Sequence, residues 1–122
     1  MSGIVFKPPE WGVTHSAADN TVSTIAKAAE TLGIHYVTGI TVSLSGAANA
    51  AAAPVTFSLS DGATVIWTVK LSNIINESET VQLAGLNLRG TKNTAMTLAS
   101  TQPAASSRTT VAMSGYTEQQ TA

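Results

Sequence analysis

Two histidines are the side chains of this chain best suited to acid–base or metal chemistry. His15 and His35 stand twenty residues apart, and neither has a carboxylate at the spacing of a metal ligand. The chain has no Cys, so thiolate ligands, disulfides and cysteine nucleophiles are excluded. Because a metal centre needs several converging ligands, the sequence predicts no metal site and no cofactor.

The acidic residues give no better evidence of catalysis. Glu77 and Glu79 are the one close pair, whereas general acid–base work needs two carboxylates set across a cleft. No Gly-x-Ser-x-Gly elbow and no glycine-rich phosphate loop occurs. We therefore expect a protein that is not an enzyme and has no catalytic residues. The seven carboxylates, all in expected loops or strand ends, are Glu10, Asp19, Glu30, Asp61, Glu77, Glu79 and Glu118.

The composition is unusually poor in charge. Charged residues make up 11% of the 122, against about 25% in average proteins. The net charge is −1 and no basic run occurs, which argues against a nucleic-acid partner. A surface of Ser, Thr and Ala is poorly defended against association. This favours a protein that works in an assembly, although a neutral β surface can also belong to a protein that is simply soluble.

Membrane insertion and secretion have no support in the sequence. No apolar run approaches the roughly 20 residues that span a bilayer. The N-terminus shows no charged segment followed by an apolar one, so no signal peptide is visible. We expect the protein to be used in the cytoplasm, or assembled there into a particle that is released by lysis.

One long alternating stretch organises the chain. Between Ile34 and Ser45, Ile, Tyr, Val and Leu side chains share one parity, and mostly polar ones share the other. Side chains on a strand alternate between faces, so this predicts a strand with one buried and one wet face. His35 falls on the polar parity, so we expect it to be solvated. Val37 is the one apolar exception there.

A hairpin follows. Asp61-Gly62 is the strongest short turn signal in the chain, and alternating apolar residues flank it on both sides. We expect Trp67 in the core rather than as a ligand platform. The residues predicted to be buried in this hairpin and in the organising strand are Val55, Phe57, Leu59, Val65, Trp67, Val69, Ile40, Val42 and Leu44.

The segment from Asn20 to Leu32 is ambiguous. Its apolar residues fit a helical stripe, but Asn20–Ala26 is echoed by Asn93–Ala99, with four of seven positions identical. Both copies should adopt one structure, and the second lies among strands. We therefore predict a strand from Asn20 to Lys27, with a loop or one helical turn up to Gly33.

Strands at short, regular spacing with turn signals between them predict an all-β fold. An antiparallel two-sheet sandwich fits best, most simply a jelly roll of eight strands, with an immunoglobulin-like sandwich as the rival. We expect an extended N-terminal arm over residues 1–18, a sandwich over 19–117 and a flexible tail over 118–122. In the arm, Pro8-Pro9 enforces extended backbone.

Four short motifs resemble small virion proteins of tailed bacteriophages, of the jelly-roll head-decoration or cement type. They are β-strand patterns without a chemical signature, and the resemblance covers about Asp19 to Tyr116. The motifs are Gly33-Ile34-His35-Tyr36-Val37-Thr38-Gly39-Ile40, Val65-Ile66-Trp67-Thr68-Val69, Gly90-Thr91-Lys92-Asn93-Thr94-Ala95-Met96-Thr97-Leu98 and Val111-Ala112-Met113-Ser114-Gly115-Tyr116.

This resemblance implies a non-catalytic protein on the capsid exterior that clamps neighbouring major capsid proteins. It implies a homo-oligomer, a dimer or a trimer, assembled in the host cytoplasm, with no nucleic-acid or membrane partner. Similar modules occur in head fibres and tails, where they bind a receptor or carbohydrate, so this alternative stays open. The apolar residues of the arm are expected to contact another chain, with packing on their own domain as the open alternative: Ile4, Val5, Phe6 and Trp11.

Overall fold

The chain folds into β-strands connected by turns and loops. The structure, a computed structural model, describes residues 10–46, 54–72, 78–104 and 106–120, and no helix occurs in these ranges. The strands are β1 (Glu10–Ser16), β2 (Thr24–Lys27), β3 (Gly33–Gly46), β4 (Val55–Asp61), β5 (Thr64–Leu71), β6 (Ser78–Leu83), β7 (Leu88–Arg89), β8 (Met96–Ser100) and β9 (Ser107–Gln119).

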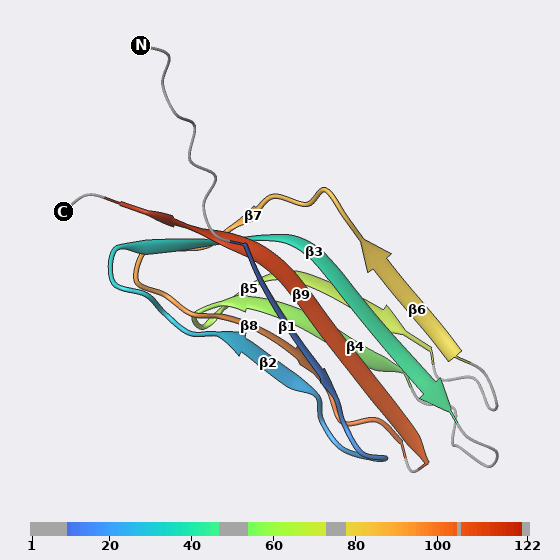
Figure 1. Cartoon of the computed structure of the whole chain (residues 1–122). Helices are drawn as coiled ribbons and strands as arrows, with labels where there is room; N and C mark the ends of the chain where they lie inside the picture. The colour runs from blue at the N-terminus through green and yellow to red at the C-terminus, as the bar shows by residue number, and fades with distance from the viewer. Residues whose placement is uncertain (1–9, 47–53, 73–77, 105, 121–122) are drawn as a thin grey trace.

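The strands form two antiparallel sheets that lie one over the other (Figure 1). One sheet has the order β1-β9-β3-β6, with β7 beside β3, and we call it the β9 sheet; the other, β2-β8-β4-β5, is the β4 sheet. Apart from β7, the first strand pairs with the last, the second with the second-last and the third with the third-last, around the β4–β5 hairpin. This nested pairing is the jelly roll, so both the sandwich and the jelly-roll predictions are confirmed.

The core lies between the inner faces of the two sheets. Phe57, Leu59 and Leu98 of the β4 sheet are fully buried, as are Ile40 and Val42 of the β9 sheet. Large apolar side chains from both sheets interdigitate there, as in other sandwiches. The remaining buried members of this cluster are Ile25, Val37, Leu44, Val55, Leu71, Met96, Val111 and Met113.

A bulge in β3 interrupts the predicted alternation. On its N-terminal side, the residues predicted to face solvent point to the core instead. The register against β9 shifts between Val37 and Gly39. An extra residue in one strand moves the next side chains to the opposite face. Val37 therefore lies in the core together with Ile40, and His35 is fully buried on the same side. The prediction that His35 is solvated is wrong, because the face on which it lies is the inner one before the bulge.

A second bulge displaces one predicted core residue. The pairing of β4 with β5 shifts between Leu59 and Ser60. Val65, beyond this shift, is 56% exposed, whereas Ile66 packs against the core. The prediction of a buried Val65 is therefore wrong. Trp67 and Val69 are partly buried against the core, because β5 is an edge strand.

The internal echo is a real structural repeat. Asn20 and Asn93, at equivalent positions, both adopt positive φ, 56° and 62°. The Thr that follows each Asn donates its hydroxyl to the carbonyl two residues before it. The two copies then pair antiparallel with each other, since β2 lies against β8 with Ile25 opposite Leu98.

The strand predicted for Asn20–Lys27 is confirmed only in its second half. Asn20 lies in a turn, and β2 begins at Thr24. Asn is one of the few residues that tolerate positive φ, and this turn sets the entry into the strand. Residues 28–32 form a loop with a turn, closed by a hydrogen bond from Gly33 N to Glu30 O.

The sheets extend beyond the predicted domain boundaries at both ends. β1 begins at Glu10, within the segment expected to be an arm, and β9 continues to Gln119, within the expected tail. The reason for the first difference is that β1 is an edge strand with few apolar side chains, so its alternation is weak. Residues 1–9 of the expected arm lie outside the described residues.

The core predicts a sharp contrast between two strand residues. Phe57→Ala should lower the free energy of unfolding by about 3–5 kcal/mol, because it removes a fully buried ring. Val65→Ala should cost less than about 1 kcal/mol, because that side chain is largely exposed. Urea denaturation followed by tryptophan fluorescence measures both. Equal losses would contradict the placement of Val65.

Candidate functional site

The outer face of the β9 sheet carries small, uncharged side chains in rows across the strands. Residues directly opposite one another in neighbouring strands point to the same side, so the register defines each row. Polar strand faces normally carry Lys and Glu, whereas these rows carry none. The three rows are Gly12, Ser114 and Gly39; then Thr14, Ala112, Thr41 and Gln82; then Ser16, Thr110, Ser43 and Thr80.

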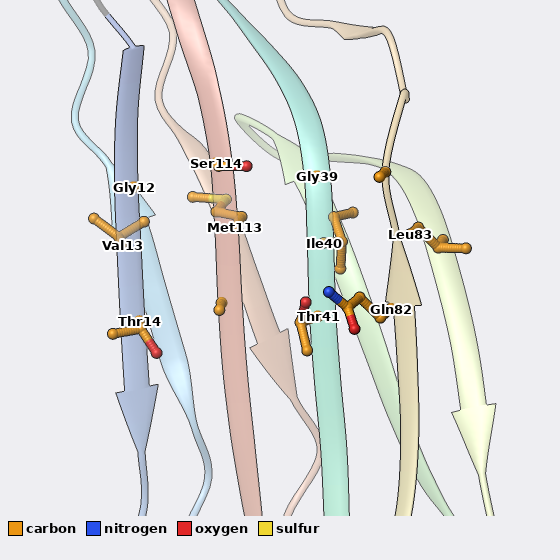
Figure 2. Close-up of a pocket in the computed structure, with 12 residues that line it drawn as sticks. Gly12, Val13, Thr14, Gly39, Ile40, Thr41, Gln82, Leu83, Met113 and Ser114 are labelled. Atoms are coloured by element: carbon orange, nitrogen blue, oxygen red, sulfur yellow. The ribbon is translucent and has the colours of Figure 1, made fainter.

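The first row forms a groove, which we call the glycine groove. It has a volume of about 400 Å³ and runs across β1, β9 and β3 to the end of β6 (Figure 2). Gly12 and Gly39 place no side chain on this face, and Ser114 between them is small. Thr14, Ala112, Thr41 and Gln82 border one side, and Leu83 and Ala84 close the β6 end.

The two glycines of the groove differ in the room that they leave. A Cβ built on Gly12 would have its nearest neighbour, Met113 O, at 3.9 Å, which is ordinary contact. A Cβ on Gly39 would lie 2.8 Å from Ser114 Oγ, so the serine would have to move. Neither glycine has positive φ. Gly12 is therefore needed neither for backbone conformation nor for packing within the subunit, and its effect is to keep the groove open.

An aromatic pair forms the next row of the sheet beyond the groove. Tyr36 and Tyr116 face each other across β3 and β9 with ring centroids 4.8 Å apart and ring planes 10° from parallel. Arg89 Nε donates a hydrogen bond to Tyr36 Oη at 3.0 Å. This bond raises the pKa of Arg89 above its ordinary value. Charged residues therefore lie at both ends of this row, Arg89 on β7 and Glu10 on β1, outside the groove lining.

A second cleft, of about 320 Å³, lies where β1 approaches the end of β2. Lys27 and Glu30 form an ion pair of 3.2 Å beside it, and Lys27 Nζ lies 5.9 Å from the centroid of the Trp11 ring. Lys27 and Glu30 are thus engaged with each other. Its lining residues are Glu10, Trp11, Lys27, Glu30, Thr117 and Gln119.

Trp11 is tied to its own domain through a buried histidine. Trp11 Nε1 donates to Thr117 Oγ1 at 3.1 Å, and the Trp11 and His35 rings meet edge to face. His35 Nε2 lies 2.7 Å from Ala28 O and Nδ1 lies 2.6 Å from Thr117 Oγ1. Since a carbonyl only accepts, Nε2–H donates to Ala28 O, and Nδ1 is hydrogen-bonded to the Thr117 hydroxyl. Both ring nitrogens are therefore satisfied, and the histidine fixes structure.

Of the four residues expected to bind a partner, the structure describes one. Trp11 belongs to β1 and is partly buried, while Ile4, Val5 and Phe6 lie outside the described residues. His15 is exposed on β1, far along the sheet from the His35 cluster. Within the described ranges, no three His, Asp or Glu side chains gather as metal ligands would. Nor does that part of the chain contain a helix long and apolar enough to span a membrane.

The groove was missed by reasoning from sequence. Its signal was present, because a glycine inside a strand often marks close approach of another backbone or ligand. The alternation counted Gly39 only as a polar-face position, and Gly12 lay in a segment not assigned to the sheet. The residues that line the groove include no charged side chain and no histidine.

Comparisons with known proteins give one structural likeness. No family model and no curated protein matches the chain. Among solved structures, the coat protein of tobacco streak virus is similar with a TM-score of 0.34 and 10% sequence identity, over 93% of this chain and 89% of that one. At this score the two structures share too little geometry for the coat protein's role to bear on this chain.

The His35 cluster predicts a specific stability loss. Thr117→Val keeps the side-chain shape but leaves Trp11 Nε1–H and His35 Nδ1 without partners. We expect a loss of about 1–3 kcal/mol in the free energy of unfolding, because buried polar groups would be unpaired. Thr80→Val, exposed on β6, is the control and should change it by less than about 0.5 kcal/mol. Chemical denaturation distinguishes them, and equal effects would refute the proposed hydrogen bonds.

Proposed function

We propose that this chain is a structural protein of a virion, which stabilises a bacteriophage capsid by clamping neighbouring major capsid proteins. The observation that carries the proposal is the outer face of the β9 sheet, where three successive rows across the strands contain no charged side chain. The resemblance of the strand motifs to head-decoration proteins supports the same role. No step of it requires a reactive group.

The physics of association explains why such a face suits a clamp. Burying a charge at an interface costs several kcal/mol unless it is paired, whereas Ser, Thr, Ala and Gly lose little. A stable interface buries about 1,600 Å², so a clamp needs a broad area without this penalty. The outer face of the β4 sheet has one such row, Thr24, Ala99, Ser58 and Thr68, with Lys70 in the next row opposite Thr56. Both faces of the sandwich can therefore meet neighbours.

A clamp must also hold more than one subunit. We propose that the protein is a homo-oligomer, a dimer or a trimer, on the capsid exterior, and that its N-terminal residues reach another chain. Ile4, Val5 and Phe6 are the apolar side chains of that segment, and Trp11 anchors its base to the sandwich through Thr117. Because Pro8-Pro9 restricts the backbone, less entropy is lost when the segment docks.

Removal of residues 1–9 tests this role. The truncation spares β1, so we expect an unchanged melting transition and weaker binding to empty capsids in co-sedimentation. Burial of one large apolar side chain is worth about 1.5–3 kcal/mol. Replacing Ile4, Val5 and Phe6 by Ser should therefore weaken binding at least about tenfold. Lys7→Ser is the matched control and should bind as the unmodified protein does.

The outcomes separate the possible roles. Undiminished binding by the truncated chain would place the contact elsewhere on the sandwich. If the chain does not bind empty capsids but binds glycans as an isolated protein, it is instead the receptor- or carbohydrate-binding module of a fibre or tail. A loss of the melting transition on truncation would show that residues 1–9 belong to the fold.

A further inference from the structure

The glycine groove is an open, uncharged groove in the outer face of the β9 sheet. Gly12 stands on an edge strand, where a β-branched residue would favour the strand more. Its backbone does not need glycine, and a Cβ there would meet no close neighbour. Gly12 therefore weakens β1, and no contact within the subunit requires a glycine there. A group from outside the subunit that occupies this space would explain the glycine.

We propose that the glycine groove of one copy binds the apolar segment Ile4–Phe6 of a second copy. The inference rests on the proposed function only in taking the N-terminal residues as the segment that contacts another chain. It adds the receptor, the outer face of the β9 sheet at Gly12, Ser114 and Gly39, and it makes the partner a sister subunit.

Complementarity supports this occupant. A volume of about 400 Å³ lies within the range of pockets that enclose a small ligand or a few side chains. The groove lining contains no charged residue, and Ile4, Val5 and Phe6 carry none. Hydroxyl and amide groups of Thr14, Thr41 and Gln82 stand along one side of the groove, where they can bond the backbone of an extended chain (Figure 2).

The direction of β1 favours a sister copy over the same chain. β1 enters the β9 sheet at Glu10 and runs toward Ser16, so the strand passes the groove at Gly12 in the direction away from the N-terminal residues. To fill its own groove, the chain would have to reverse at Pro8-Pro9. Proline fixes φ, and the residue before a proline is biased to extended backbone, so a tight reversal there is disfavoured.

The reach of the segment is sufficient. Nine extended residues span about 30 Å, and four strands about 4.8 Å apart are about 15 Å across. The segment can therefore leave its own sandwich and lie across a neighbour's sheet. Reciprocal exchange would produce a dimer, and head-to-tail exchange that closes would produce a trimer.

Cysteine cross-linking of the purified full-length chain tests the contact directly, because the natural sequence has no Cys. One preparation carries Gly12→Cys and an affinity tag. The other carries Ile4→Cys, Val5→Cys or Phe6→Cys in turn. After mixing and mild oxidation, we expect disulfide-linked dimers of a tagged and an untagged chain, mapped by peptide mass spectrometry. Ser16→Cys, on the same strand and face but outside the groove, is the control and should lose this product.

A blocking variant provides an independent measurement. Gly12→Val fills the groove, so it should shift the sedimentation velocity of the full chain from oligomer to monomer without lowering its melting temperature. Ser16→Val should leave the oligomer intact. The inference is overturned if Gly12→Val assembles normally, or if the unmodified chain is a monomer.

Cross-linking also identifies the wrong occupant. A Val5→Cys, Gly12→Cys double variant that closes only within one chain would show that the segment fills its own groove, against the proposal. All these measurements are made without capsids. If the chain assembles through the groove but does not bind shells, only the proposed function is refuted. If the chain binds shells as a monomer, only this inference is refuted.

Discussion

The position of β9 between β1 and β3 is the constraint on which the rest of the structure depends. The last strand of the chain is an inner strand of its sheet, paired along β1 on one side and along almost all of β3 on the other. Without β9, neither β1 nor β3 has its main neighbour, and Val111 and Met113 are missing from the core. The pairing joins opposite ends of the chain, so forming it costs conformational entropy. Burial of apolar side chains in the core has to offset this cost.

A buried group of hydroxyls holds the two sheets in register near one end of β9. Ser23, just before β2, donates to Thr109 O at 2.9 Å, and Thr109 Oγ1 donates back to Ser23 Oγ at 2.7 Å. Ser100 of β8 accepts from Ser23 N. Each of these groups is buried and partnered, so a shift of one sheet over the other would leave several polar atoms unpaired. The apolar core alone would resist such a shift less specifically.

The same small residues serve inside and outside for different reasons. Inside, Ser and Thr saturate one another's hydrogen bonds. Outside, they keep the sheet faces free of charge, which removes the usual defence of a β protein against association. Such a surface is a disadvantage for a free monomer, because it allows association. It is an advantage for a subunit that functions in contact with neighbouring subunits. Gly12 and Gly39 have a similar effect. They lower the stability of their strands and leave open space on the outer face.

The sequence by itself determined the strands and the class of fold, because alternation and turn chemistry act locally. Asp61-Gly62 and the repeated Asn-Thr segments adopt the turns that their residue types favour. Three features were decided only by tertiary structure. The bulges at Thr38 and near Ser60 put His35 inside and Val65 outside, and β1 is a strand because β9 offers it a partner. The groove likewise exists only because the register sets Gly12, Ser114 and Gly39 side by side. Except for the bulge near Ser60, which lies within the β4–β5 hairpin, these features depend on pairings between residues far apart in the chain, such as Gly12 with Ser114, which no local pattern encodes.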